Sequence, residues 1–150
     1  MAELGPVYLD TDGLLDLVTP MSPQDRTDLH EISLALDEGG LAFVTSELTI
    51  LESLVHAVRT GDRNRETLLR RFLTPGSFVA TVPVTLDIIE DALLLRANFN
   101  LRTPDAIHVA SGMQAGCRVF LSKDAKWRRA GATLVSPAQL ASRLRDQQAL

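Results

Sequence analysis

The most informative run of residues is Val7-Tyr8-Leu9-Asp10-Thr11-Asp12-Gly13-Leu14-Leu15. Its first three residues are apolar and β-prone, as in a buried strand. Two carboxylates and a glycine follow before a new apolar run, so the pattern predicts a strand, a sharp turn and a helix. Ligands of open α/β sheets bind beyond the carboxyl ends of the strands, where Asp10 falls. Asp10 therefore binds a cation or acts on a substrate, or else Asp10 or Asp12 caps the following helix.

Short apolar strands alternate with helical segments along the rest of the chain. Further strands are expected at 41–44, 78–82, 118–121 and 132–135. Helices are expected at 14–19, 23–38, 47–59, 63–73, 85–99, 103–115 and from 136 onward, with a loop or short helix at 123–129. This alternation predicts an α/β fold in which helices cover both faces of a parallel sheet of four or five strands. Asp10 is expected on a central strand of this three-layer α/β/α architecture.

The composition is that of one globular domain. The chain has 150 residues, of which 45% are hydrophobic and 23% charged, so we expect a single domain over 1–150 with a frayed tail at 146–150. The net charge of −4 argues against nucleic-acid binding by overall positive charge, but it allows an enzyme that uses metal cations and local arginines. The single cysteine, Cys117, excludes an intramolecular disulfide and is expected to be a buried small hydrophobe.

No segment has the length of apolar sequence that a membrane span requires, which is about 20 residues. The N-terminal residues lack the basic region and long apolar run of a signal peptide. We therefore expect a cytoplasmic protein without a membrane partner.

Acidic residues follow several of the expected strands. Asp10 ends the first strand, Glu47 and Glu52 lie on the helix after the second, Asp105 opens a helix, and Asp124 follows the fourth strand. Because parallel strands run in one direction, residues beyond their ends meet at one edge of the sheet. Carboxylates gathered there repel one another and need a counter-charge. Oxygen-only clusters suit Mg²⁺ or Mn²⁺, whose usual chemistry at such a site is phosphodiester hydrolysis.

Each acid also has an ordinary structural explanation. The helix dipole favours Asp105 and Glu47 in a first helical turn, and Asp124 fits an exposed loop. Periodicity does not separate Glu47 from Glu52, because both lie beside apolar residues of the same helix. The joint pattern, and no single residue, predicts the metal site.

Four segments of the sequence match a known pattern when they are taken together. They are Val7-Tyr8-Leu9-Asp10-Thr11, Thr45-Ser46-Glu47-Leu48-Thr49-Ile50-Leu51-Glu52, Leu101-Arg102-Thr103-Pro104-Asp105-Ala106-Ile107-His108-Val109-Ala110 and Val119-Phe120-Leu121-Ser122-Lys123-Asp124. The set resembles the PIN-domain ribonucleases, most closely the VapC-like toxins of toxin–antitoxin pairs. The third segment is the most specific, and the set spans nearly the whole chain in the expected order.

The resemblance implies a PIN-like fold and a metal-dependent endoribonuclease that uses Mg²⁺ or Mn²⁺. The family's catalytic and metal-binding acids fall on Asp10, Glu52, Asp105 and Asp124, so the resemblance selects Glu52 over Glu47. The implied partners are an RNA substrate, a cognate antitoxin protein and a second copy of the chain in a homodimer.

The chain departs from the family pattern at two positions. Asp12 stands where a small hydroxyl residue is frequent, and Lys123 stands where Asn is common. Thr11, Asp12 and Ser122 are candidate accessory residues, and Lys123 is expected to offset the charge of Asp12 or to touch phosphate. Basic residues near the last acid are candidate contacts to RNA phosphates: Lys123, Lys126, Arg128 and Arg129.

Two other side chains near these motifs are expected to stabilise the fold rather than to act on a substrate. His108, one turn beyond Asp105, is interpreted as a structural histidine, and Trp127 as a partly buried anchor rather than a base-stacking surface. Apolar residues on the helical segments 47–73 exceed what a two-layer contact needs and are expected to form a homodimer or antitoxin contact: Leu54, Val58, Leu68, Leu69 and Phe72.

Two other functions remain open from the sequence. Asp10-Thr11-Asp12-Gly13 resembles the nucleophile motif of haloacid-dehalogenase-like phosphatases, in which Asp10 would accept the phosphoryl group and Asp12 would protonate the leaving group. Leu14 replaces the Thr of that motif, and its downstream metal motif is absent. A catalytically inactive PIN-like binding module is the non-enzymatic alternative.

Overall fold

The computed structural model describes residues 4–74 and 76–149, and a five-stranded parallel sheet forms its centre. The strands are β1 (Pro6–Leu9), β2 (Ala42–Ser46), β3 (Val79–Val82), β4 (Val119–Leu121) and β5 (Thr133–Val135). Their order across the sheet is β3-β2-β1-β4-β5. The predictions of a parallel sheet and of a central strand ahead of Asp10 are therefore confirmed.

Helices connect the strands and return the chain to the same edge of the sheet each time. They are α1 (Thr11–Val18), α2 (Pro23–Asp37), α3 (Glu47–Thr60), α4 (Arg63–Leu73), α5 (Leu86–Phe99), α6 (Thr103–Gln114), the 3-10 helix η1 (Ala125–Ala130) and α7 (Pro137–Gln148). Helix α1 begins at Thr11, earlier than expected, because Asp10 caps it. Helix α7 continues to Gln148, inside the segment 146–150 expected to fray, and Leu150 lies outside the described residues.

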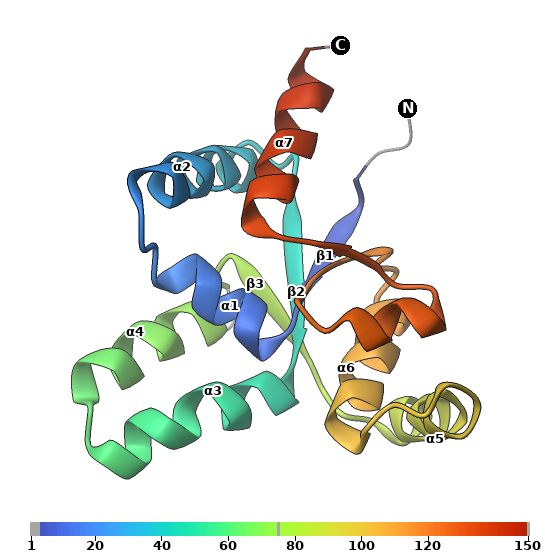
Figure 1. Ribbon diagram of the computed structural model, residues 1–150. Helices are drawn as coiled ribbons and strands as arrows, with labels where there is room; N and C mark the ends of the chain where they lie inside the picture. The colour runs from blue at the N-terminus through green and yellow to red at the C-terminus, as the bar shows by residue number, and fades with distance from the viewer. Residues whose placement is uncertain (1–3, 75, 150) are drawn as a thin grey trace.

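Strand side chains alternate between two separate cores, as the pleat of a sheet requires. In β1, Val7 and Leu9 enter a core shared with α1, α2, α4 and α7. Tyr8 enters the other core with residues of α5 and α6. Figure 1 shows α3 and α4 on one side of the sheet and α5 and α6 on the other, which gives the expected three layers.

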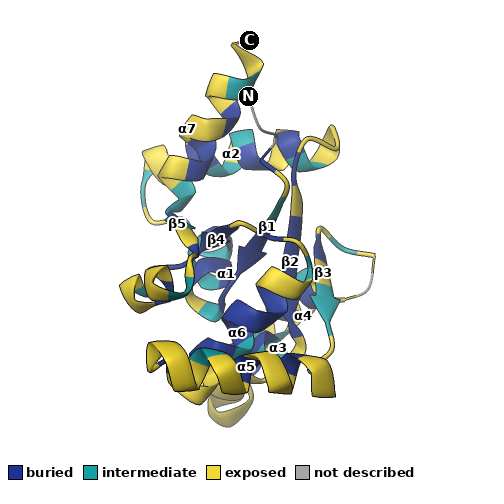
Figure 2. Ribbon diagram, turned by 90° about the vertical axis from the view of Figure 1, so that its right-hand side faces the viewer, coloured by how far each residue is buried: buried dark blue, intermediate teal, exposed yellow. Residues whose placement is uncertain are grey.

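Helix α6 packs directly on the sheet because Gly112 carries no side chain. A Cβ at this position would stand 3.0 Å from the ring of Tyr8 and would overlap the ring of Phe120. Figure 2 shows the result: α6 is largely buried, whereas α5 outside it is mostly exposed. This close contact brings His108 of α6 against Tyr8 of the central strand.

The core also includes residues that the sequence placed elsewhere. Leu54 and Leu69 are buried in the core, so their expected place on an exposed surface was wrong, whereas Val58 and Leu68 are exposed. Cys117 is buried, as expected. Among the helices of residues 4–74 and 76–149, none combines the length and the apolarity that a membrane crossing needs.

Candidate active site

Asp10 lies buried at the carboxyl end of β1, the central strand. Its Oδ1 accepts a hydrogen bond of 2.6 Å from the backbone N–H of Gly13, and its Oδ2 accepts one of 2.6 Å from Ser122 Oγ. Burial raises the pKa of Asp10, and the hydrogen bonds from Ser122 and Gly13 oppose that rise. Asp10 thus caps α1 and also occupies the strand end where a ligand would bind, so the two interpretations of this residue are compatible.

Gly13 allows the first turn of α1 to lie directly against the end of β4. A Cβ on Gly13 would overlap the carbonyl oxygen of Leu121 and stand 3.0 Å from Asp10 Oδ1. Only a residue without a side chain fits between the two elements. The glycine of the Asp-Thr-Asp-Gly stretch is therefore required by packing at this edge of the sheet.

Asp124 is linked to Asp10 through Ser122. The backbone N–H of Asp124 donates to Ser122 Oγ at 3.2 Å, while Ser122 itself donates to Asp10. Asp124 caps η1, because its Oδ1 accepts from the backbone N–H of Lys126 at 3.1 Å. The Ser122 hydroxyl thus joins the Asp10 carboxylate to the backbone of Asp124 at the end of β4.

Glu52 approaches the same edge from α3. Its Oε1 accepts hydrogen bonds from Thr11 Oγ1 at 2.8 Å and from His108 Nε2 at 2.6 Å. Burial favours a higher pKa for Glu52, but the hydrogen bonds from His108 and Thr11 outweigh it, so the pKa lies below its ordinary value. Glu47 is exposed in the first turn of α3. Of the two acids, Glu52 is the one that contacts the residue after Asp10.

Asp105 is buried in the first turn of α6, and Arg102 holds its carboxylate. Arg102 Nε lies 3.1 Å from Asp105 Oδ2, and the arginine side chain is mostly exposed. In the described part of the chain, no three His, Cys, Asp or Glu side chains lie close enough together to hold a metal ion. The convergence of all four acids within metal-bridging reach therefore stays a prediction.

The donor set nevertheless fits Mg²⁺ or Mn²⁺ by its chemistry. Carboxylates and hydroxyls supply only oxygen, the ligand that hard divalent cations prefer. Asp10 is an acid whose charged form burial disfavours, and a bound cation would offset that cost. The ion pair with the exposed Arg102 shows that a positive charge on the solvent side can reach the Asp105 carboxylate.

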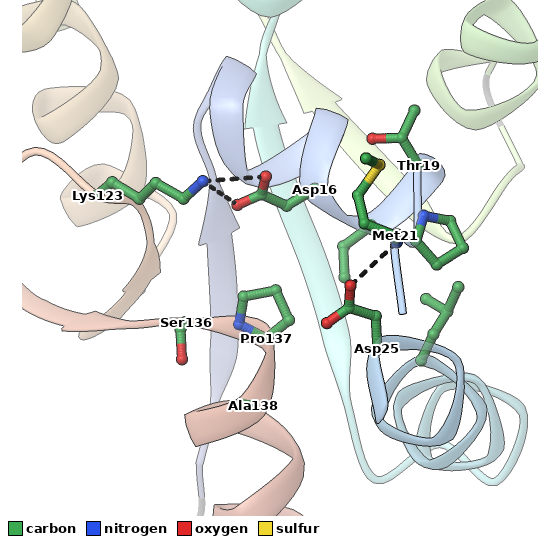
Figure 3. Close-up of a pocket in the computed structure, with 11 residues that line it drawn as sticks. Asp16, Thr19, Met21, Asp25, Lys123, Ser136, Pro137 and Ala138 are labelled. Atoms are coloured by element: carbon green, nitrogen blue, oxygen red, sulfur yellow. Dashed lines mark hydrogen bonds and ion pairs between the residues drawn. The ribbon is translucent and has the colours of Figure 1, made fainter. Parts of the chain in front are cut away.

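Lys123 lines a cleft of about 340 Å³ between α1, α2 and α7. Its Nζ lies 3.1 Å from Asp16 Oδ2, and this contact raises the pKa of Lys123. Figure 3 shows the ion pair at the cleft, beside Ser136 and Pro137. The ion-pair partner of Lys123 is thus Asp16, and the charge of Asp12, the expected partner, adds a smaller attraction.

The remaining basic candidates are exposed on η1, namely Lys126, Arg128 and Arg129. Trp127, between them, is only 1% exposed. Its ring packs against His108 and Phe120, so it is a buried anchor and not a surface for stacking bases.

Three residues of this region make contacts that the sequence does not predict: Tyr8, Arg102 and His108. Tyr8 OH lies 2.7 Å from His108 Nδ1, and His108 continues to Glu52. The only sequence signal for His108 was its place one helical turn beyond Asp105. Tyr8 could have been placed on the side of α6 from the strand alternation alone.

Comparisons with known proteins agree with this fold. The family model described as PIN domain matches residues 7–132. A toxin–antitoxin complex from Klebsiella pneumoniae has a chain with a TM-score of 0.60 and 24% identity, over 87% of this chain and 97% of that one. VapBC2 from Rickettsia felis, bound to a promoter DNA fragment, has a chain with a TM-score of 0.68 and 11% identity, over 87% of this chain and 98% of that one.

A third solved structure is VapC20 from Mycobacterium tuberculosis, a sarcin-ricin loop cleaving toxin. It gives a TM-score of 0.64 at 18% identity, over 87% of this chain and 99% of that one. These likenesses concern the fold. No curated protein matched the sequence. The family match extends over most of the chain and includes all four candidate acids. The chain therefore belongs to the PIN-domain family, and the haloacid-dehalogenase interpretation of Asp10 and Asp12 is set aside.

Proposed function

We propose that this chain is a Mg²⁺- or Mn²⁺-dependent endoribonuclease and the toxin of a toxin–antitoxin pair, acting in the cytoplasm. One observation carries the proposal. At the carboxyl end of β1, Asp10 and Thr11 receive side chains from two distant elements, Ser122 after β4 and Glu52 on α3. Membership of the PIN-domain family supports it, as does the likeness in fold to a toxin that cleaves the sarcin-ricin loop.

The four acids would hold a cation in two ways, directly and through water. A divalent cation bound here would act as a Lewis acid toward the scissile phosphodiester. We assign Asp10 and Asp105 as direct ligands, and Glu52 and Asp124 as ligands that act partly through water, since Mg²⁺ keeps several waters in its shell. Ser122 and Gly13 hold the Asp10 carboxylate in one orientation. Asp105 becomes available when its contact with Arg102 opens.

RNA would lie across the exposed face of η1. Lys126, Arg128 and Arg129 are exposed beside Asp124 and can pair with phosphates. Lys123 would join them once it leaves Asp16, because an ion pair between exposed side chains is weak. Such contacts position the strand without reading its sequence, so the basic residues would set affinity more than base preference.

The protein partners follow from the same proposal. Structures of similar fold include toxin–antitoxin complexes, and we propose a cognate antitoxin for this chain. We also propose a homodimer through one exposed face of α3, where Leu51, Val55 and Val58 recur at helical spacing, with Leu68 of α4 beside them. Co-expression with the product of an adjacent small reading frame tests the antitoxin, which should co-purify with the chain and relieve its toxicity.

The nuclease proposal is tested with single-stranded RNA and added Mn²⁺ or Mg²⁺. Loss of a residue that only supports a metal ligand typically lowers activity about 10- to 100-fold. Asp10→Asn and Glu52→Gln should lower the cleavage rate by more than this. Asn still caps a helix, so Asp10→Asn should fold. Glu47→Gln is the matched control, because it removes an exposed acid from the same helix and should leave the rate unchanged.

Undiminished cleavage in EDTA, or by both site variants, would contradict a metal-dependent nuclease. An inactive PIN-like binding module would neither cleave RNA nor bind Mn²⁺ at this edge of the sheet. That outcome would leave the antitoxin proposal to be tested separately by co-purification.

A further inference from the structure

A continuous chain of hydrogen bonds runs from the second core to the candidate active site. Tyr8 OH lies 2.7 Å from His108 Nδ1, and His108 Nε2 lies 2.6 Å from Glu52 Oε1. The three residues come from β1, α6 and α3. The chain begins at a side chain buried in the core and ends at a half-exposed carboxylate.

The imidazole ring of His108 is stacked on one face and hydrogen-bonded at both nitrogens. The ring is 3% exposed. It stacks on Trp127 with centroids 5.8 Å apart and meets Tyr8 edge-on at 5.9 Å. These contacts favour one orientation of the ring, in which Nε2 points at Glu52.

The hydrogen-bond chemistry fixes the direction of the chain. An ionised carboxylate only accepts, so His108 Nε2 carries the hydrogen and donates to Glu52. In the neutral ring Nδ1 then accepts the hydroxyl hydrogen of Tyr8. The buried Tyr8 hydroxyl thus favours the tautomer whose Nε2–H donates to Glu52, since the hydrogen bond at one ring nitrogen sets which nitrogen carries the hydrogen.

Both donors to Glu52 use the same oxygen atom. Thr11 Oγ1 and His108 Nε2 each donate to Oε1, and no hydrogen bond reaches Oε2 from the residues that the structure describes. Two donors on one oxygen fix the plane of the carboxylate and leave the second oxygen as the one available to a ligand.

We propose that His108 is a positioning residue for Glu52, set in its tautomer by Tyr8, and that it presents Oε2 to a divalent cation. This inference rests on the proposed function, since it concerns how one of the proposed metal-binding acids is held. It replaces the interpretation of His108 as a structural histidine alone.

A purely structural histidine makes a different prediction. Its loss would lower the free energy of unfolding but would leave the affinity of the folded protein for a cation unchanged. A positioning histidine changes that affinity even in variants that fold fully. Cation binding measured without RNA therefore separates the two roles.

The test compares His108→Gln with His108→Asn in the full chain. The Gln amide extends to the position of Nε2 and can still donate to Glu52, whereas the shorter Asn amide reaches only the side of Tyr8. Mn²⁺ affinity is measured by calorimetry, and folding by circular dichroism. Asn should weaken Mn²⁺ binding about 10- to 100-fold, the usual cost of a lost outer-shell partner, and Gln should restore most of it.

A double variant completes the test. In a Glu52→Gln background, His108→Asn should cause no further loss of Mn²⁺ affinity, because the carboxylate that it positions is gone. Unchanged affinity in folded His108→Asn, or an equal loss in the Glu52→Gln background, would overturn the inference. If the unmodified chain itself binds no Mn²⁺, the proposed function fails, and that result is distinct from a failure of His108 alone.

Discussion

Asp10 and Ser122 stand 112 residues apart in the sequence, and a hydrogen bond of 2.6 Å joins Ser122 Oγ to Asp10 Oδ2. The bond ties the end of the central strand β1 to the end of its neighbour β4. Burial raises the pKa of Asp10, and this bond is the largest influence opposing that rise. Ser122 therefore contributes to stability and to the state of the candidate active site at once.

Replacing Ser122 by Ala should destabilise the protein. The change leaves buried Asp10 with one donor and removes the acceptor of the Asp124 backbone N–H. A hydrogen bond to a charged group contributes about 1.5–3 kcal/mol to the free energy of unfolding, and we expect a loss in that range in urea unfolding. Ser142→Ala, on an exposed position of α7, is the control and should change it by less than about 0.5 kcal/mol. Equal effects of the two substitutions would contradict the role given to Ser122.

Gly13→Ala should also destabilise the protein, for a steric reason. The added methyl group would overlap the carbonyl oxygen of Leu121 and crowd Asp10, and overpacking of this kind costs about 1–3 kcal/mol. Gly40→Ala is the matched control, because the nearest atom to its Cβ is 3.8 Å away. Thermal unfolding of the two variants measures the difference. A Gly13→Ala variant as stable as Gly40→Ala would mean that α1 can move away from β4.

The sequence was sufficient for the elements and the order of layers, because strand alternation and helix periodicity depend on local residues. It missed the start of α1, since Thr11-Asp12-Gly13 has low helix propensity. Those residues are helical because Asp10 caps the turn and Gly13 fits against Leu121. Leu54 and Leu69 were misplaced for a similar reason: they are buried by neighbouring elements that a two-layer contact does not include.

The sequence proposes a set of acids for the candidate site but does not predict their contacts. Periodicity could not separate Glu52 from Glu47, because the choice depends on how α3 is rotated against β1. The partners that settle the contacts of Glu52, Thr11 and His108, lie 41 and 56 residues away. The pairing of Arg102 with Asp105 is equally hard to predict, because a basic and an acidic residue near the start of a helix do not always form an ion pair.

Cys117 should be unreactive in the folded protein. Burial raises the pKa of its thiol to about 11, so very little reactive thiolate is present at about pH 8. Iodoacetamide should label the native protein slowly at that pH and the urea-unfolded protein rapidly, as mass spectrometry would show. Because the pKa is higher in the folded state, the thiol favours folding below its ordinary pKa of 9.0 and loses this contribution as the pH rises toward 11. Rapid labelling of the native protein would contradict the burial of Cys117.

The proposed homodimer surface on α3 gives a prediction about assembly. The exposed side chains of Leu51 and Val58 lie on one face of the helix, and introducing charge there should block burial against a second copy. Leu51→Glu with Val58→Glu should sediment as a monomer at concentrations where the unmodified chain is a dimer. Leu34→Glu, an exposed leucine on α2, is the control and should remain dimeric. A monomeric unmodified chain at every concentration would exclude this homodimer.

Arg102 should compete with a cation for Asp105. Its Nε lies 3.1 Å from Asp105 Oδ2, and its side chain is mostly exposed while that of Asp105 is buried. An ion pair with one exposed partner is worth at most about 1 kcal/mol, so Arg102→Gln should tighten Mn²⁺ binding by about five-fold or less.

Arg118→Gln is the control for net charge, because Arg118 precedes β4 at the opposite end of the strand. Calorimetric titration with Mn²⁺ should show no change for it beyond a small long-range effect that added salt removes. An equal gain in both variants would show that only overall charge matters. A loss of affinity in Arg102→Gln would show instead that the arginine holds Asp105 in the orientation that a cation needs.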